Sequence, residues 1–377
     1  RVLADNGATV VRVESANRIE TARTIQPFLN DEGGAENSGL YQNMNAGKLG
    51  LTVDMSKDEA REIILDLVRW ADVVCESFSP KAMKTWGLSY EDLKEVKPDI
   101  IVASSCLFGQ SGPLSSLAGF GTMGASLSGF YTLTGWPDRD PAGCFGAYTD
   151  YISPRFLSSA ILAAVDHRDR TGEGQYIDLS QAEASLSFLA PALLDYVVNG
   201  READRPGNRH AMMAPHGVFP VAGEDLWITV VCENDEQWRS LVALAGFDAG
   251  LAEADLAGRQ AREDELEELI GGWTADQDGA ELEAALQNAG VAGHRVQGSD
   301  LLTDDPQLVH REHFVEVEHA DHGSIHVEGS RFKLSRTPAE ITQGGPTLGQ
   351  HTFDVLMGIL DYDEDRIAEI AVAGVLE

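Results

Sequence analysis

The pattern of apolar and polar positions changes along the chain between short apolar runs and segments with a helical period. Runs rich in Val and Ile predict buried strands, and apolar residues that recur every three or four positions predict helices. Strands are expected within residues 8–14, 72–78, 99–106 and 170–180, and helices at residues 56–71 and 89–98, capped by Ser56 and Ser89. Strands that alternate with helices predict a parallel α/β sheet.

A further helix is expected near the middle of the chain. Ser153 followed by Pro154 is an N-cap and first-turn pair typical of a helix start, and the pattern carries this helix to about His167. The single carboxylate just ahead of it is Asp150, which stands among small and aromatic residues in GAYTDYISPRF.

The pattern changes beyond about Glu183. A helical stretch to Val198, a hairpin around Gly223 and two acidic helices, at residues 235–245 and 261–289, predict a second, smaller α+β domain. We therefore expect a large domain at residues 1–195, a linker and small domain at 196–325, and a C-terminal segment at 326–377 that returns to the large domain.

The charge of the chain limits its partners. Its 377 residues carry 61 acidic and 28 basic side chains, a net charge of −33 that is spread along the sequence. Such a surface repels nucleic acid and anionic membranes, so neither is expected as a partner. The chain has no apolar run of about 18 residues. Its four cysteines form no CxxC pair, which predicts reduced thiols in a cytoplasmic protein.

Three motifs suggest sites but are explained better in other ways. GFGTMG at residues 119–124 matches a dinucleotide fingerprint, yet it follows a loop rather than a strand, so a chance match is favoured. Four histidines at residues 313–326 lie in what is expected to be a solvated hairpin, and no metal is expected there. The Ser-centred elbow G-x-S-x-G of hydrolases is absent.

Asp150 is the remaining candidate for a catalytic residue. A carboxylate at a helix start is usually a cap or a dipole partner, but Ser153 is expected to be the cap here. The small residues around Asp150 allow a ligand to approach closely. A carboxylate of ordinary pKa is ionised at neutral pH and acts as a nucleophile without a general base.

The order of several segments resembles the class III (CaiB/BaiF-type) CoA-transferase family over essentially the whole chain. The segments are GATVVRVE, NAGKLGLTVDMS, SFSPKAMKTWG, FGQSGP, GAYTDY, HRDRTGEGQYIDLS, GNRHAMMAPHGVFP, DDPQL, SRTPAE and GPTLGQHT. The resemblance implies a Rossmann-like large domain that binds coenzyme A, a smaller α+β domain and an interlocked homodimer. It also implies that the family's opening strand and first helix precede Arg1.

The resemblance assigns Asp150 as the nucleophile of a CoA-transferase in acyl-CoA metabolism. Asp150 would attack an acyl-CoA to give a mixed anhydride and then an aspartyl-CoA thioester, and a small carboxylic acid would accept the CoA, with no metal. The residues that match the family's CoA-binding segments are Asp54, Met55, Ser77, Phe78, Ser79, Lys84, Gly119 and Phe120. Arg18 and Arg23, near the first βα loop, are expected to supply charge for the CoA phosphates.

Related activities stay open. An intramolecular CoA-transferring isomerase would use the same aspartate. An α-methylacyl-CoA racemase of this family needs a His and an Asp where this chain has Phe120 and Gly121, and Phe cannot move a proton. The segment MMAPHG, in place of a glycine-rich loop, makes formate and oxalate poor candidate substrates. Outside the enzyme class, a non-catalytic acyl-CoA-binding protein would not need Asp150.

Overall fold

The computed structural model describes residues 1–377 and divides them into two compact units. The large unit comprises Arg1–Ser128, Gly146–Phe188 and Thr303–Glu377, and the small unit comprises Gly129–Phe145 and Leu189–Leu302. Each unit contains its own apolar clusters of buried side chains, so each has its own core.

The large unit is an α/β structure with short parallel strands. Its strands are β1 (Val11–Glu14), β2 (Leu49–Thr52), β3 (Val73–Glu76), β4 (Ile101–Cys106), β5 (Tyr176–Ser180), β9 (Phe314–His319) and β10 (Gly323–Glu328). Its helices are α1 (Val2–Asp5), α2 (Gly39–Asn45), α3 (Ala60–Trp70), α4 (Pro80–Thr85), α5 (Tyr90–Val96), α6 (Gly121–Leu127), α8 (Tyr148–Thr171), α9 (Gln181–Leu186), α16 (Pro306–His310) and α17 (Glu364–Val372).

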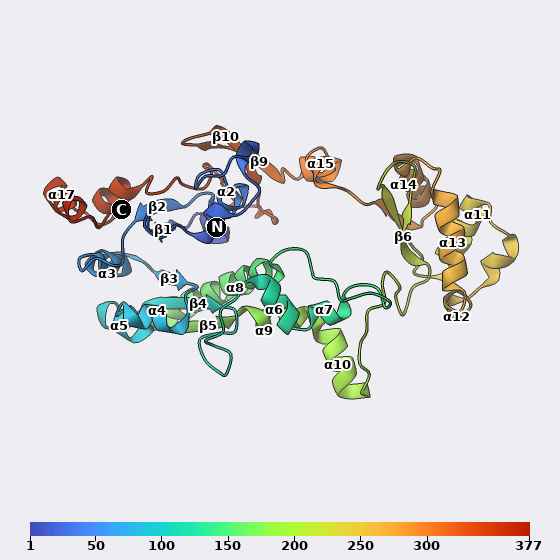
Figure 1. Cartoon of the computed structure of the whole chain (residues 1–377), viewed down its shortest axis with the longest axis horizontal. Coiled ribbons are helices and arrows are strands. Elements are labelled where there is room, and N and C mark those ends of the chain that lie inside the picture. The colour runs from blue at the N-terminus through green and yellow to red at the C-terminus, as the bar shows by residue number, and fades with distance from the viewer. The chain divides into compact units, whose positions relative to one another are not determined.

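Two parallel sheets and one hairpin organise these strands. β1 pairs with β2, β4 lies between β3 and β5, and β9 pairs antiparallel with β10 (Figure 1). Five of the six residues of β4 are buried, as expected for a strand with neighbours on both sides. The predicted α/β fold with parallel strands is confirmed, and so is the cap of α5, where Ser89 and Asp92 form a capping box.

The C-terminal segment lies along the outer edge of β2 (Figure 1). The N–H of Gly50 donates to Nδ1 of His351 at 3.0 Å, and the N–H of His351 donates back to the carbonyl of Gly50 at 2.8 Å. A Cβ on Gly50 would lie 2.9 Å from Pro346, so only glycine fits there. The motif GPTLGQHT therefore ties the end of the chain to the large unit.

A buried ion cluster anchors the loop that follows β1. The guanidinium of Arg23 is fully buried and donates to Glu14 at 2.9 and 3.0 Å and to the carboxylate of Glu36 at 2.7 Å. It also donates to the Tyr41 hydroxyl at 2.6 Å and the Pro346 carbonyl at 3.0 Å. With its donors used inside the unit, Arg23 is not open to a CoA phosphate, which corrects that expectation.

Two predicted caps are wrong. α3 begins at Ala60 rather than at Ser56, because the carboxylate of Asp54 accepts the Ser56 N–H at 2.9 Å and turns the chain before the helix. α8 begins at Tyr148 and contains Pro154, while Ser153 is buried inside it. Proline has no N–H to offer the carbonyl four residues earlier, so the first turns of α8 lack one hydrogen bond at Asp150.

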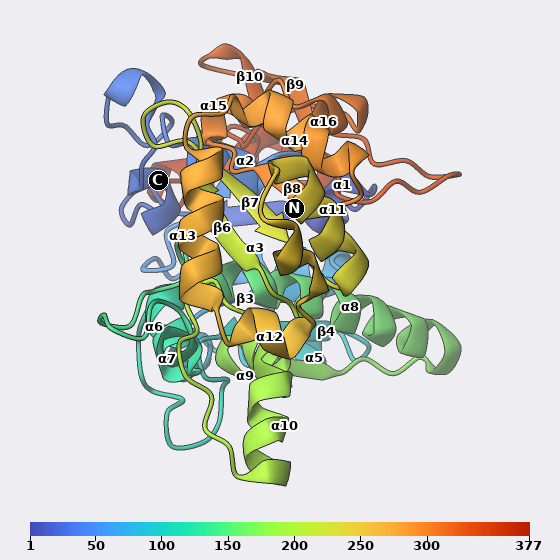
Figure 2. The same ribbon diagram turned by 90° about the vertical axis from the view of Figure 1, so that its right-hand side faces the viewer.

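The small unit packs helices on one face of an antiparallel sheet. Its strands are β6 (His216–Pro220), β7 (Trp227–Val231) and β8 (Ala292–Arg295), and its helices are α7 (Phe130–Leu133), α10 (Ala190–Asn199), α11 (Asp235–Ala245), α12 (Leu256–Gln260), α13 (Glu263–Thr274), α14 (Gly279–Asn288) and α15 (Ser299–Leu302). Phe219, Ile228 and Val230 of the sheet pack against α11, α13 and α14, which cover the sheet in Figure 2.

In the small unit the structure confirms the predicted hairpin and the first acidic helix, and it divides the second acidic helix in two. The hairpin expected around Gly223 is β6 with β7, and α11 has the predicted bounds. The single helix expected at residues 261–289 is instead two helices, α13 and α14. The break falls at Asp278, whose side chain accepts the N–H groups of Ala280 and Glu281 and so starts a new helix.

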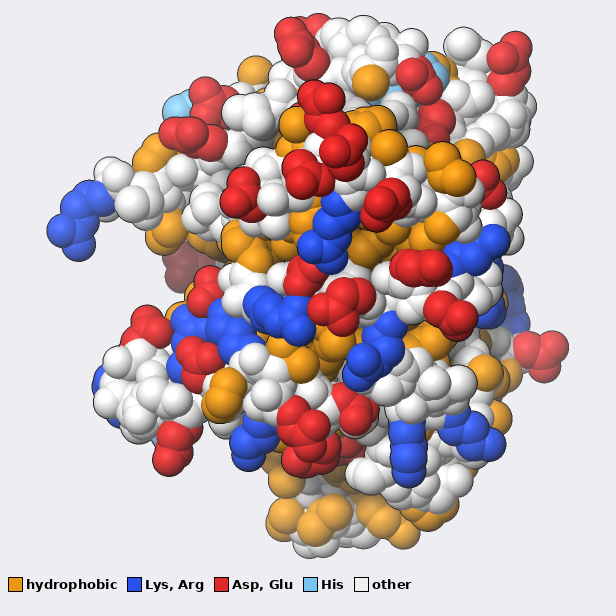
Figure 3. All heavy atoms as spheres, turned by 90° about the vertical axis from the view of Figure 1, so that its left-hand side faces the viewer, with side chains coloured by type: hydrophobic (Ala, Val, Ile, Leu, Met, Phe, Trp, Pro, Cys, Tyr) orange, Lys and Arg blue, Asp and Glu red, His pale blue; other side chains and the backbone are white.

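Acidic side chains are spread over much of the face drawn in Figure 3 rather than gathered in one patch, and Lys and Arg are interspersed among them. The helices include none that is both long enough and apolar enough to pass through a bilayer.

Replacing Arg23 by Met should lower the free energy of unfolding by about 3–5 kcal/mol, because it leaves the Glu14 carboxylate buried with fewer partners. Chemical denaturation followed by circular dichroism measures this. Arg69→Met is the matched control: Arg69 is exposed and pairs with Glu62 and Asp66 at the surface, so the loss should stay below about 1 kcal/mol.

The pKa of Glu14 determines how the loss of stability in Arg23→Met should depend on pH. Burial alone would raise the pKa of Glu14, but the hydrogen bonds from Arg23 and Tyr41 and the charge of Arg12 outweigh burial and lower it. A carboxylate with a lowered folded-state pKa stabilises the fold above its unfolded pKa, and this contribution disappears as pH falls through the folded value. The Arg23→Met deficit should therefore shrink in acid. A deficit that stays constant with pH would contradict the ion-pair account.

Candidate active site

Asp150 lies in the first turn of α8, where its side chain is half-buried. The chain enters the helix through Gly146, whose φ of +62° favours glycine, and the N–H of Asp150 donates to the carbonyl of Ala147 at 2.9 Å. The neighbouring side chains Thr149 and Ile152 are buried and fix the turn against the unit. A carboxylate in the first helical turn also interacts favourably with the helix dipole.

One oxygen of Asp150 is bound to a backbone N–H from another helix. The N–H of Gly121, the first residue of α6, donates to Oδ2 of Asp150 at 3.2 Å. Oδ1 accepts no hydrogen bond from the chain. A Cβ on Gly121 would lie 2.8 Å from the carboxylate of Asp150 and 2.8 Å from the carbonyl of Ala147. This contact therefore requires glycine at position 121.

The glycines of GFGTMG serve helix packing. Gly124 lies against Thr149, where a Cβ would be 2.8 Å from the Thr149 hydroxyl oxygen and 2.7 Å from Leu107. Thr149 in turn donates to the carbonyl of Gly121 at 3.3 Å. The motif follows a loop and brings α6 close to the first turn of α8, which explains its glycines without a dinucleotide.

Burial sets the ionisation of Asp150. It raises the pKa of this carboxyl above its ordinary value, and the hydrogen bond from Gly121 offsets only part of the rise. The carboxylate is less hydrated than a surface one, and a less hydrated anion is a better nucleophile. The geometry thus presents one free oxygen of a carboxylate whose other oxygen is held.

The predicted segment at residues 77–79 lies where β3 ends. Phe78 is 49% exposed, and its ring meets that of Trp86 edge-on at 5.1 Å. The backbone of Phe78 is fixed on both sides: its N–H donates to Glu76 at 2.6 Å, and its carbonyl accepts from the Cys106 thiol at 3.2 Å. Ser79 precedes α4, and Lys84 lies in the last turn of that helix.

The end of β4 connects this segment with the surroundings of Asp150. Cys106, the last residue of β4, contacts the Phe78 carbonyl, while the next side chain, Leu107, lies against Gly119 and Gly124. Phe120 follows Gly119, precedes α6 and is 67% exposed. Ligands of parallel α/β sheets bind at the carboxyl ends of the strands, and here this edge carries both groups of predicted residues.

Asp54 and Met55, at the end of β2, have structural contacts of their own. The carboxylate of Asp54 accepts hydrogen bonds from the Ser56 N–H at 2.9 Å and from the Asn17 side chain at 3.1 Å. These bonds, that of Ser56 foremost, hold the pKa of Asp54 below its ordinary value. Met55 is partly buried between two apolar clusters of the large unit. The role of these two residues toward CoA stays a prediction.

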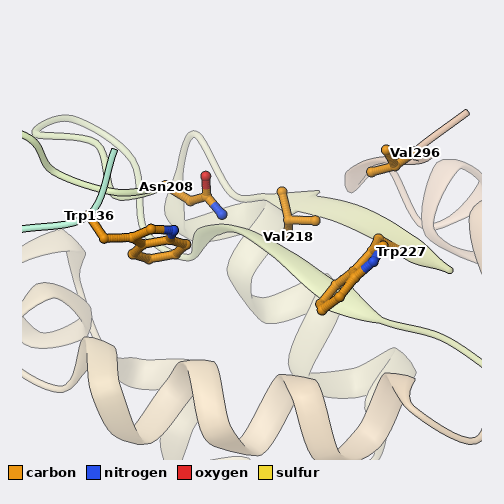
Figure 4. Close-up of a pocket in the computed structure, with 5 residues that line it drawn as sticks. All are labelled: Trp136, Asn208, Val218, Trp227 and Val296. Carbon is orange, nitrogen blue, oxygen red and sulfur yellow. The ribbon is translucent and has the colours of Figure 1, made fainter. Parts of the chain in front are cut away.

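A groove of about 430 Å³ lies on the small unit, on the sheet face opposite the helices. Figure 4 shows Val218 and Trp227 on its two strands, Trp136 and Asn208 from loops, and Val296 after β8. These five residues include no ionisable group and none of the predicted site residues. The groove thus offers an apolar surface rather than a reactive one. Elsewhere, no group of three or more His, Cys, Asp or Glu side chains is arranged to hold a metal ion.

Comparisons with known proteins identify the family of the chain. The family model of CoA-transferase family III matches residues 1–352. The succinate–glutarate CoA-transferase of Agrobacterium fabrum is 31% identical over 94% of this chain and 90% of its own length. The succinyl-CoA:mesaconate CoA-transferase of Haloarcula hispanica is 32% identical over the same shares. A crystal structure of a CaiB/BaiF family protein from Brucella suis superposes with a TM-score of 0.87 at 29% identity, covering 95% of this chain and 93% of that one.

The chain therefore belongs to CoA-transferase family III. It is an enzyme of this class, whose members use CoA thioesters as substrates, and the resemblance predicted from the sequence is confirmed. Sequence reasoning predicts Asp150 as the nucleophile, and this stays a prediction; it gave no contact role to Gly121, which donates to Asp150, or to Gln110, which donates to the Phe78 carbonyl. The signals were present in the quoted motifs GFGTMG and FGQSGP, but only the folded chain shows what those residues touch.

With Asp150 as the predicted nucleophile, Gly121→Ala should lower kcat for CoA transfer about 100-fold or more, because displacing such a group by about 1 Å costs that much. Steady-state kinetics of CoA transfer from an acyl-CoA to a carboxylic acid measures it. The control is Gly272→Ala in α13, where a Cβ meets nothing within 4 Å. That change should leave kcat unaltered and add about 0.5–1 kcal/mol of stability, since alanine is the better helix former. Equal kinetics in both variants would contradict the assigned contact.

Proposed function

We propose that this enzyme moves CoA from an acyl-CoA to a carboxylic acid through covalent intermediates on Asp150. Asp150 attacks the thioester carbonyl, which forms a mixed anhydride and releases the CoA thiolate. The thiolate attacks the aspartyl carbonyl, which forms an aspartyl-CoA thioester and releases the donor acid. The acceptor carboxylate repeats both steps in reverse and regenerates Asp150. The observation that carries this proposal is the half-buried carboxylate with one oxygen held by Gly121 and the other free.

The proposed substrates are succinyl-CoA as donor and a small dicarboxylic acid as acceptor. The support is that the relatives from Agrobacterium and Haloarcula are named for succinate or succinyl-CoA with glutarate or mesaconate. All of these acids offer a carboxylate that can attack an aspartyl thioester. The sequence-based doubt about oxalate and formate stays a prediction.

The proposed CoA site uses the carboxyl edge of the large unit's sheet. Ser77, Phe78 and Ser79 would meet the adenine end, Lys84 the phosphates, and Gly119 with Phe120 the part close to Asp150. The half-exposed ring of Phe78 and the exposed side chain of Phe120 support contact with a ligand. No metal takes part in this scheme, because each step exchanges one activated acyl group for another.

The related chemistries are weaker proposals. A racemase needs a proton carrier at position 120, and phenylalanine there carries none. An intramolecular isomerase needs the same Asp150 and differs only in the substrate, so tests with separate donor and acceptor acids decide between them. A non-catalytic acyl-CoA-binding protein would tolerate Asp150→Asn.

We also propose that the enzyme works as an interlocked homodimer, as the family resemblance implies. The support lies in α10, none of whose residues is buried. Leu194, Val197 and Val198 are 58%, 70% and 74% exposed. In Figures 1 and 2, α10 extends away from the sheet and helices of its own unit. A helix with this much exposed apolar surface requires a partner, and a second copy of the chain is the proposed one.

Hydroxylamine added during turnover with succinyl-CoA should convert Asp150 to a hydroxamate, because hydroxylamine attacks both the anhydride and the thioester. Peptide mass spectrometry locates the change. Asp150→Asn should abolish the product and lower kcat by at least about 1,000-fold, as for the loss of other nucleophiles. Turnover with an unmodified Asp150 peptide would reject the covalent route.

The Asp150→Asn variant should also fold at least as well as the wild type. A carboxyl whose pKa is raised in the folded state favours folding only below its unfolded pKa, and this contribution is lost as pH rises through the folded value. At neutral pH the buried charge of Asp150 therefore opposes folding. Chemical denaturation at neutral pH should show an unchanged or higher free energy of unfolding, which separates loss of chemistry from loss of structure.

Replacing Leu194 and Val197 together by Glu should prevent dimer assembly, because it places charges on the apolar surface of α10. Analytical ultracentrifugation should show a dimer for the wild type and a monomer for the variant. Val372→Glu is the control, since Val372 in α17 is 90% exposed and should tolerate a charge. A wild-type monomer, or an unaltered dimer in the double variant, would exclude α10 as the interface.

A further inference from the structure

Three polar side chains form a row across the ends of the parallel strands. The register pairs Glu76 of β3 with Ser104 of β4, and Ser104 with Asp178 of β5. The Tyr176 hydroxyl donates to Ser104 at 2.9 Å, and Ser104 is the register partner of Glu76 on the neighbouring strand. Glu76, at one end of this row, directly precedes the segment of residues 77–79 and accepts the Phe78 N–H at 2.6 Å.

Gln110 joins this row to the segment. Its side-chain amide donates to the Phe78 carbonyl at 3.2 Å, to the Cys106 sulfur at 2.8 Å and, at 3.4 Å, to Glu76. Its backbone N–H donates to Asp178 at 2.8 Å, and the preceding Gly109, at a φ of +79°, makes the tight turn that this requires. One side chain thus reaches both Glu76 and Phe78.

We propose that Gln110 is a positioning residue for CoA: through Glu76 and the Phe78 carbonyl it holds residues 77–79 in the conformation that receives the cofactor's adenine end. The inference rests on the proposed CoA site. Phe78 is half-exposed, and Glu76, Cys106 and Gln110 are what hold its backbone. Without the Gln110 side chain, residues 77–79 are held by fewer hydrogen bonds. CoA must then order this segment when it binds, which weakens its affinity.

The groups around position 110 explain why an amide side chain is needed there and a carboxylate would not serve. The Glu76 carboxylate and the Phe78 carbonyl, which the side chain of Gln110 contacts, accept hydrogen bonds, so the side chain at position 110 must donate. Burial, the largest cause, and the nearby Asp178 raise the pKa of Glu76. A carboxylate at position 110 would have no donor to offer and would repel its neighbours.

The first test is Gln110→Leu, which keeps the volume and removes the amide. The Kd for free CoA, measured by calorimetry, and the KM for succinyl-CoA should each rise about tenfold, the cost of losing one to two hydrogen bonds. kcat at saturation should stay within about twofold, because Asp150 is untouched. Gln307→Leu, an exposed glutamine in α16, is the control and should change neither constant.

The second test is Gln110→Glu, which keeps the shape of the side chain. It should make KM depend on pH, which a residue that only fills space would not do. Its KM should exceed that of Gln110→Leu at neutral pH and should fall as pH decreases and the new carboxyl is protonated into a donor. The titratable groups facing it are Glu76, Asp178, Cys106 and Tyr176. KM values that do not depend on pH, or that match the wild type, would overturn the proposal.

The outcomes separate this proposal from the proposed function. A Kd for CoA in Gln110→Leu within twofold of the wild type overturns the role of Gln110, even if hydroxylamine still labels Asp150. A tenfold weaker Kd with no labelling of Asp150 in any variant supports Gln110 and rejects the covalent mechanism. If Gln110→Leu does not fold, the pH dependence of Gln110→Glu decides.

Discussion

The site depends on one close contact, between the N–H of Gly121 and Oδ2 of Asp150. It exists because two helices approach more closely than side chains would allow, with glycine at positions 121 and 124 of α6 and Thr149 facing them on α8. The contact orients a carboxylate that burial has made less hydrated. It satisfies one oxygen and leaves the other free, which is the arrangement that a carboxylate nucleophile needs.

The large unit brings distant parts of the sequence to the same edge. The chain between β4 and β5 carries α6 and α8, and with them Gly121 and Asp150, while residues 77–79 follow β3. The end of β4 contacts both groups, through Leu107 on one side and Cys106 on the other. A short buried strand therefore sets the relation between the proposed nucleophile and the proposed CoA segment, and Gln110 adds a donor to that relation.

The sequence predicted the α/β class, the small-unit hairpin and the cap at Ser89, since each has a local signal. It placed the start of α8 at Ser153 because Ser-Pro usually begins a helix, whereas here Pro154 is tolerated inside a helix held by tertiary packing. It predicted wrongly that Arg23 could contact a CoA phosphate, because the residues around Arg23 in the sequence do not show that its side chain is buried in the fold. Asp150 was predicted through the family pattern, while its contact with Gly121 joins residues 29 positions apart and has no local signal.

The central claim is that Asp150 carries the acyl group, and oxygen exchange tests it most directly. When a carboxylate acceptor attacks the aspartyl thioester and the chain's carboxylate is later released, one acceptor oxygen stays on the aspartate. After turnover with an acceptor acid labelled with oxygen-18, the peptide that contains Asp150 should hold heavy oxygen, and no other peptide should. Transfer of CoA to the labelled acid with an unlabelled Asp150 peptide would contradict the account.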